Sequence, residues 1–108
     1  KKLEEAESWY HRAREVFEEI QDLSRIVRTY GQLGMVAEER DDIQGALQWA
    51  GRTYQLARDN GLPVMNQVRA HLARLRDTQG EDNFAQWWRS FADEEPPTDL
   101  DVDTQTPI

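Results

Sequence analysis

Apolar residues near the start of the chain recur at alternating steps of three and four positions. The members of this first stripe are Leu3, Ala6, Tyr10, Ala13, Phe17 and Ile20. Such spacing places every apolar side chain on one face of an α-helix. The stripe stops at Gln21, and Asp22 or Ser24 can cap the N-terminus of a following helix. The pattern therefore predicts an amphipathic helix over about residues 3–20.

Four further segments show the same periodicity, separated by polar breaks at residues 39–42, 59–61 and 78–80. Their apolar positions are Ile26, Tyr30, Leu33 and Ala37, then Ile43, Ala46, Ala50, Thr53 and Ala57, then Val64, Val68, Leu72 and Leu75, and finally Phe84, Trp88 and Phe91. No stretch shows the alternation typical of a strand. We therefore expect an all-α fold of five helices, in which the second pairs with the third and the fourth with the fifth as antiparallel hairpins. The first helix is then the second half of a hairpin whose first half is missing.

An Ala-x-x-Trp pair occurs three times along the chain. The pairs are Ala6 with Trp9, Ala46 with Trp49 and Ala85 with Trp88, so that the tryptophans are 40 and 39 residues apart. A near-constant period indicates a repeated unit that buries the same face in each copy, and it favours a packing role for these tryptophans. Trp87 breaks the pattern: it either packs against the C-terminal tail, covers the end of the stack or is exposed for a partner.

The middle copy resembles a tetratricopeptide repeat. The matching groups are Tyr30-x-x-Leu33-Gly34-x-x-Ala37, Ala46-Leu47-x-Trp49-Ala50 and Thr53-Tyr54-x-x-Ala57. The step exceeds the usual ~34 residues and is similar to the extended variant of bacterial regulatory proteins and kinesin light chains. Over residues 3–92 the resemblance implies a right-handed α-solenoid of about two and a half repeats, built from antiparallel helix hairpins.

The resemblance also implies a binding surface, because such arrays commonly bind through the concave groove lined by their inner helices. By position, the groove residues would be Arg28, Gln32, Met35 and Glu39 from the second helix, and Gln67, His71 and Arg74 from the fourth. Members that hold a peptide's terminal carboxylate use Lys, Asn and Arg at set positions, where this chain has Gly31, Met35 and Ala70, with only Arg74 basic. We therefore expect a non-catalytic module that binds a peptide or partner protein without that clamp, at the C-terminal end of a longer array in a regulatory protein.

The charge of the chain divides it into two parts. The net charge is −8, and residues 93–108 contain six acidic residues and no Lys or Arg, whereas the remainder has 15 acidic and 13 basic residues. This distribution disfavours a nucleic-acid partner, which normally requires a basic surface. We expect a helical domain over residues 1–93 and a disordered, acidic, Pro-containing tail or linker over residues 94–108. Alternatively, the tail folds back on Arg69, Arg74 or Arg76 and covers the groove.

No residue set supports catalysis, a metal or a cofactor. The chain has no cysteine, and no Ser-His-acid grouping stands out. His11 has Glu7 and Glu15 four positions to either side, but we favour a solvated helix face over a metal site. No apolar run reaches the ~20 residues of a membrane span. We therefore expect a cytoplasmic protein that is not an enzyme; the missing initiator Met suggests a piece of a longer protein.

The first helix suggests a second function class. Since its own inner helix is missing, the flank near Trp9, Ala13 and Val16 should remain uncovered in the isolated chain. Trp9, Val16 and Trp87 are therefore the candidate end-surface contacts for a weak homodimer or for packing against the parent protein. In this alternative the chain is a structural, self-associating module.

Overall fold

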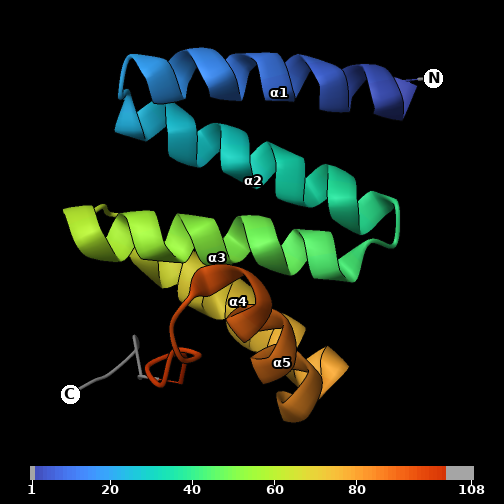
Figure 1. The fold of residues 1–108 in the computed structure, drawn as a ribbon, viewed down its shortest axis with the longest axis vertical. Helices are drawn as coiled ribbons and strands as arrows, with labels where there is room; N and C mark the ends of the chain where they lie inside the picture. The colour runs from blue at the N-terminus through green and yellow to red at the C-terminus, as the bar shows by residue number, and fades with distance from the viewer. Residues whose placement is uncertain (1, 102–108) are drawn as a thin grey trace.

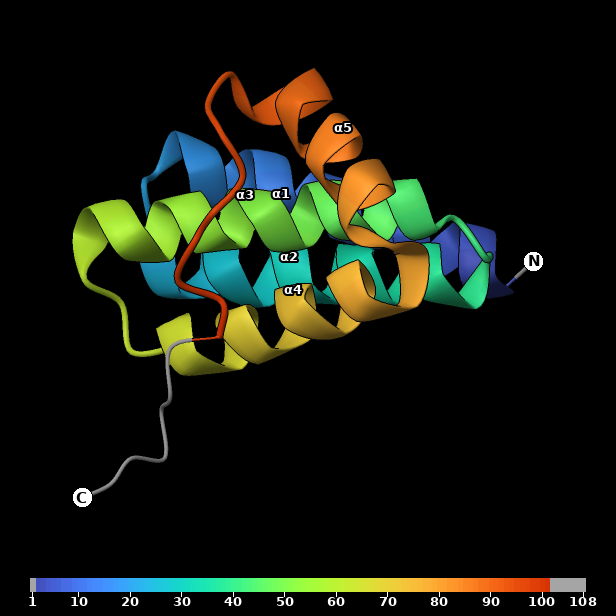
Figure 2. The same ribbon diagram turned by 90° about the horizontal axis from the view of Figure 1, so that it is seen from below.

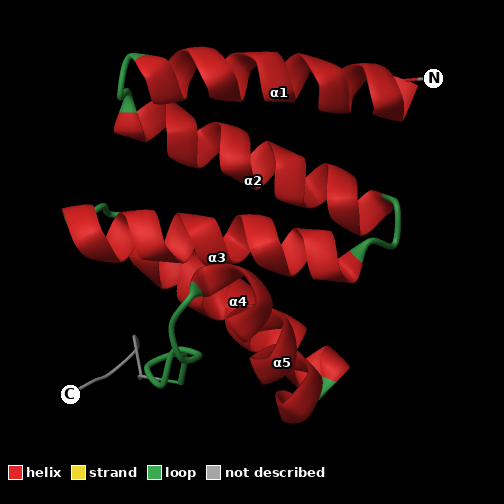
Figure 3. Ribbon diagram, in the orientation of Figure 1, coloured by secondary structure: helices red, strands yellow, loops and turns green. Residues whose placement is uncertain are grey.

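The computed structural model describes residues 2–101, and within that range the chain is helical, without a strand (Figure 3). The helices are α1 (Lys2–Glu19), α2 (Leu23–Glu39), α3 (Ile43–Asn60), α4 (Met65–Gln79) and α5 (Glu81–Ala92) (Figure 1). The expected all-α class is confirmed, and a helix is present in each of the five segments whose periodicity predicts one.

Three residues set helix ends where the sequence predicts them. The Asp22 carboxylate accepts a hydrogen bond from the backbone N–H of Arg25 at 3.3 Å and caps α2. Asp42 caps α3 in the same way, accepting from the N–H of Gly45 at 3.0 Å. Gly61 ends α3 in the left-handed conformation, at φ 62°, which a residue without a Cβ adopts at little cost.

The first three helices lie side by side and alternate in direction (Figure 1). Each packs against the next, and α3 also packs against α4 and α5, which contact each other. Seen from below, α4 lies beside α3, whereas α5 is steeply inclined to it (Figure 2). The C-terminal half is therefore organised around α3.

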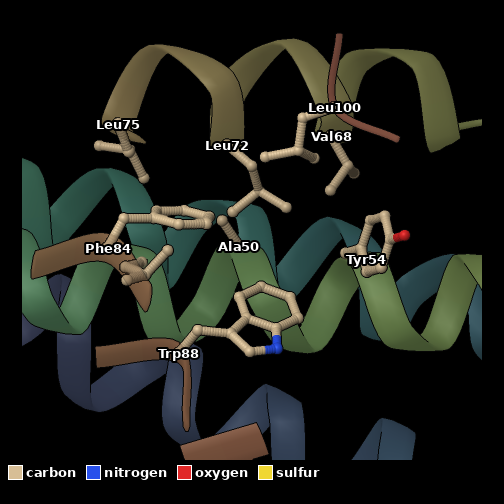
Figure 4. Close-up of a cluster of buried hydrophobic side chains, with 9 residues drawn as sticks. Ala50, Tyr54, Val68, Leu72, Leu75, Phe84, Trp88 and Leu100 are labelled. Atoms are coloured by element: carbon tan, nitrogen blue, oxygen red, sulfur yellow. The ribbon is translucent and has the colours of Figure 1, made fainter. Parts of the chain in front are cut away.

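The main core lies among α3, α4 and α5 (Figure 4). Its buried residues are Leu47, Ala50, Tyr54, Val68, Leu72, Leu75, Phe84, Trp88 and Leu100. Trp88 is completely buried. Its ring centroid lies 6.0 Å from that of Phe84, 5.2 Å from that of Phe91 and 5.8 Å from that of Tyr54. The contact with Tyr54 joins α5 to α3, and the other two lie within α5.

Gly51 lets α5 approach α3 closely. This buried helical residue lies under the rings of Phe91 and Trp88, and a Cβ at its position would collide with both. Because any larger residue would push α5 outward, the packing of the C-terminal half depends on this glycine.

The N-terminal half is packed more loosely. Helix α1 contains no fully buried residue. The hydroxyl of Tyr30 donates a hydrogen bond to Glu18 at 2.7 Å. The ring of Trp49 lies 5.8 Å from that of His11 and 5.3 Å from that of Tyr30, centroid to centroid. Half-buried contacts of this kind hold α1 against the remainder of the molecule.

The three repeated tryptophans differ in burial. Trp88 is completely buried and Trp49 is half-buried, but 66% of Trp9 is exposed. The predicted packing role is therefore wrong for Trp9 within this chain. The reason is that α1 is the first helix of the row, so that no other helix covers its outer face (Figure 1).

The expectation of a disordered tail over residues 94–108 is wrong for residues 94–101; residues 102–108 lie outside the described part. Leu100 is buried in the main core with only 6% exposed. Asp99 pairs with Arg69 and Asp101 with Arg76, whereas Arg74 pairs with Glu38 instead. Leu100 fills core space beside Val68 and Leu72 (Figure 4), and the acidic residues on either side of it meet arginines on α4.

Candidate functional site

A groove of about 350 Å³ lies where α2, α3 and α4 meet. Helices α2 and α4 supply most of its walls, and Ala50 and Thr53 of α3 contribute the remainder. The full lining is Val27, Arg28, Tyr30, Gly31, Gln32, Gly34, Met35, Ala50, Thr53, Val64, Gln67, Val68 and His71. A Cβ at Gly31 would meet nothing within 4 Å, so the groove is open to solvent beside this glycine.

The lining combines apolar and polar groups. Val27, Ala50, Val64 and Val68 provide aliphatic surface, and Met35, of which 58% is exposed, offers a flexible thioether. Arg28 and Gln67 are exposed polar residues on facing helices, α2 and α4. An apolar surface with a few polar groups at its edge is typical of sites that hold apolar side chains and orient them by hydrogen bonds.

A charged cluster adjoins the groove and links α2 to α4. Glu38 accepts a hydrogen bond from Nε2 of His71 at 2.7 Å and one from Nη2 of Arg74 at 3.2 Å. Burial raises the pKa of the Glu38 carboxyl, but the hydrogen bond and charge of His71, together with Arg74, outweigh burial and leave the pKa below its ordinary value. The carboxylate form of Glu38 therefore holds both side chains of α4.

The structure brings five of the seven predicted groove residues together. Arg28, Gln32, Met35, Gln67 and His71 line the groove, whereas Glu39 and Arg74 do not. Sequence reasoning missed Glu38. Glu38 does not line the groove itself; its carboxylate reaches His71 and Arg74 of α4, a contact between helices that local spacing does not show. The aliphatic residues of α3 and α4 were also missed, since they read as core positions.

The outer face of α1 is a second exposed surface. Trp9, Val16 and Ile20 are 66%, 53% and 61% exposed. They follow one another at steps of seven and four, and so form one stripe on the helix. The expected uncovered flank near Trp9 and Val16 is thus present, and we name Trp9, Val16 and Ile20 the α1 stripe. Contact of another protein with this stripe remains a prediction.

Trp87, the third candidate end-surface residue, lies at the junction of α5 and α3. It is half-buried and packs against the main core. Together with Phe91 it lines a hollow whose other wall, including Gln44 and Gln48, comes from the first half of α3. This packing against the main core argues against full exposure for a partner, one of the three alternatives.

The part of the chain described here, residues 2–101, holds no group of three or more His, Asp or Glu side chains placed to bind a metal ion. His11 accepts a hydrogen bond at Nδ1 from Arg14 at 3.3 Å, and Glu7 pairs with Arg40 at 3.0 Å. These two members of the candidate surface set are thus engaged with arginines. None of the described helices combines the length and apolarity needed to cross a membrane.

Comparison with protein-family models, with curated proteins and with solved structures finds no match to this chain.

Proposed function

We propose that the chain is a non-catalytic protein–protein interaction module that binds a peptide or a helix of a partner protein in the groove between α2, α3 and α4. In this proposal the helices form a right-handed solenoid of tetratricopeptide-like repeats, the end of a longer array in a cytoplasmic regulatory protein. The observation that carries the proposal is the 350 Å³ groove itself. Its size falls at the lower end of the roughly 300–1,000 Å³ of typical ligand sites.

The charges around the groove indicate the chemistry of the ligand. Glu38 already bonds His71 and pairs with Arg74, so the charge of Arg74 is largely neutralised. Arg28, by contrast, is an exposed groove residue for which no ion pair is found among the described residues. A ligand that suits this arrangement places apolar side chains against Met35 and Val68 and an acidic group near Arg28.

Gly31 offers a direct test of groove binding. A Gly31→Trp substitution fills the groove without a clash at Cβ, and Gly31→Ala is its matched control because it changes the same position but adds only a methyl group. Peptides would be selected from a random displayed library on the wild-type chain and then titrated against all three proteins. We expect binding to weaken about tenfold or more, or by at least 1.4 kcal/mol, with Gly31→Trp and to change little with Gly31→Ala.

Equal binding by Gly31→Trp, or a library that yields no binder, would contradict the proposal. An Arg28→Glu chain tests the charge separately: it should weaken the binding of selected acidic peptides and leave the binding of neutral peptides unchanged. Arg28 is preferable to Arg74 for this purpose, because replacing Arg74 would also disrupt the pair with Glu38.

A second candidate function is self-association, which the α1 stripe favours. Burying a few hundred Å² of apolar surface contributes several kcal/mol at about 25 cal/mol per Å², before the entropy of association is subtracted. Sedimentation of wild type and Trp9→Glu over a concentration series tests it. Gln86→Glu, an exposed α5 position, is the control of equal charge. A wild-type chain that stays monomeric at high concentration would rule this candidate out.

A further inference from the structure

Residues 94–101 cross from the end of α5 over α3 to α4 as a strap without helix or strand (Figure 2). Every acidic residue of this strap forms an ion pair with an arginine of α3, α4 or α5. The pairs are Glu94 with Arg58 at 2.8 Å, Glu95 with Arg89 at 2.9 Å, Asp99 with Arg69 at 3.1 Å and Asp101 with Arg76 at 2.8 Å. Three helices thus contribute arginines to the strap, and two of these, Arg58 and Arg76, also pair with Asp59 and Asp77 of their own helices.

The most specific contact is made by three consecutive residues. Leu100 enters the core beside Val68 and Leu72 (Figure 4). On one side of it, Asp99 accepts hydrogen bonds from the hydroxyl of Tyr54 at 2.7 Å and from Nε of Arg69 at 3.1 Å. On the other side, Asp101 accepts two hydrogen bonds from Arg76, at 2.9 and 2.8 Å. The helices therefore form a receptor for a leucine between two aspartates.

Several features indicate that the strap is held weakly enough for another peptide to replace it. Within residues 2–101, no backbone–backbone hydrogen bond joins the strap to a helix. The side chains of Glu95 and Asp101 are 78% and 74% exposed, and ion pairs at such positions contribute little after screening by salt. A cavity of about 250 Å³, lined by Phe84, Ala85, Pro96 and Pro97 among others, remains beneath the strap. The strap is thus held by side chains alone and packs incompletely.

We propose that this surface of α3, α4 and α5 is a second binding site, which takes an acidic peptide of a partner protein bearing a leucine between two aspartates, and that residues 94–101 compete for it within the chain. Charge complementarity identifies the ligand: departure of the strap leaves a hole where Leu100 was, flanked by Arg69 and Arg76. None of the four strap-binding arginines lines the groove between α2, α3 and α4, so the two sites differ in their charged contacts, although Val68 borders both.

The test uses the full chain and a fluorescently labelled peptide with the sequence of residues 94–101. Two chains have a weakened strap: Leu100→Ala removes the apolar anchor, and Asp99→Asn removes surface charge without opening a cavity. The apparent affinity of the site for an added peptide equals its intrinsic affinity multiplied by the fraction of time that the strap leaves the site open. If the strap is docked about nine-tenths of the time, both variants bind the peptide about tenfold more tightly than wild type. Added salt should weaken this binding.

A charge exchange tests the geometry. In a chain that carries both Asp99→Asn and Arg76→Glu, the wild-type peptide should bind more weakly than to the Asp99→Asn chain, and a peptide with Asp101→Arg should recover the lost affinity. A peptide with Leu100→Ala should bind to none of the chains. Rescue by the reversed pair would not occur if the variants merely loosened the fold.

Equal binding by wild type and both variants would overturn the proposal, as would absence of binding to an Asp99→Asn chain whose circular dichroism matches that of wild type. Because Asp99→Asn leaves the core intact, it decides the matter if Leu100→Ala does not fold. Sedimentation completes the test. Wild type could form a dimer that the Leu100→Ala substitution dissociates. That result would mean that the strap of a second copy occupies the site, and it would overturn the assignment of the site to a separate partner protein.

Discussion

At the scale of single residues, two helical glycines illustrate how the same residue type serves opposite needs. Gly31 borders the open groove, where a Cβ would meet nothing within 4 Å. Gly51 lies beneath the rings of Phe91 and Trp88, where a Cβ would collide. In an isolated helix both would cost stability, since glycine loses more conformational freedom on folding than alanine. Only at Gly51 does close packing compensate for that cost.

We therefore expect opposite effects from the same substitution at these two sites. Gly31→Ala should stabilise the chain by about 0.5–1 kcal/mol, the helix propensity gained without a clash. Gly51→Ala should destabilise it by about 1–3 kcal/mol, the typical cost of overpacking a core. Urea unfolding followed by circular dichroism measures both. Destabilisation by Gly31→Ala would mean that the groove wall is tighter than the structure shows.

The Glu38 carboxylate makes the link between α2 and α4 dependent on pH. Its pKa lies below the ordinary value of 4.5, so its contribution to stability is present above that value and is lost as pH falls through the lower value of the folded state. Glu38→Gln should cost about 0.5–1 kcal/mol at pH 6, as for a partly exposed charge pair. The difference from wild type should shrink at a second, lower pH below the pKa of the folded state, where the carboxyl is protonated in both the folded and unfolded states. Unfolding curves at the two pH values test this; a constant difference would assign the effect to packing.

At the scale of elements, the strap completes the core that α3, α4 and the short helix α5 form. Helix α5 has 12 residues, whereas α3, on which it packs, has 18. Leu100 fills the core beside Val68 and Leu72, and the Tyr54 hydroxyl bonds the adjacent Asp99 at 2.7 Å. An extended segment with one apolar anchor suffices here because arginines on the helices neutralise its acidic residues.

Docking of the strap should therefore fail at alkaline pH. Burial, together with the hydrogen bond to Asp99 and its charge, raises the pKa of Tyr54 to about 12. The stabilisation is then complete below the unfolded pKa of about 10 and is lost as pH rises from there toward about 12. Ultraviolet titration of tyrosinate should show Tyr54 ionising late, and Asp99→Asn should shift this ionisation to lower pH.

Tyr30 is the internal control for that titration. Burial and its hydrogen bond to Glu18 raise its pKa to about 12 as well, but it lies far from the strap in sequence and contacts α1. Asp99→Asn should leave the ionisation of Tyr30 unchanged. In a Tyr54→Phe chain, Asp99→Asn should no longer shift the ionisation of any tyrosine. A Tyr54 that titrates near pH 10 in wild type would show that the strap is undocked.

At the scale of the whole molecule, packing is uneven from one end to the other. The main core joins α3, α4, α5 and the strap. Helix α1, at the opposite end, has no fully buried residue and exposes Trp9, Val16 and Ile20. A chain built in this way should open locally at α1 well before it unfolds globally.

Amide hydrogen exchange should reveal this gradient. We expect the amides of α1 to exchange fastest among the five helices and those of α3 slowest, because α3 packs against three neighbours and α1 against one. Mass spectrometry of peptides from the exchanged chain measures the order. If a dimer forms through the α1 stripe, protection of α1 should rise with protein concentration; uniform protection at low concentration would contradict the uneven packing.

The sequence alone determined the five helices and their ends. Helix periodicity and caps such as Asp22, Asp42 and Gly61 act between residues a few positions apart, so they can be recognised without the fold. Part of the groove followed from the resemblance to a tetratricopeptide repeat: of the residues transferred from it by position, Arg28, Gln32, Met35, Gln67 and His71 line the groove. Glu39 was expected in the groove by its position in the resemblance, but it lies outside the lining.

Only the tertiary structure decided the remainder. The strap was expected to be disordered because its composition is acidic and poor in apolar residues, and composition does not show that Asp99 meets Tyr54, 45 positions earlier. Trp9 and Trp88 each follow an alanine by three positions, yet one is 66% exposed and the other buried, since burial depends on whether another helix lies alongside. Contacts between distant segments exist only once all five helices have packed, which is why local patterns predicted the elements and not their partners.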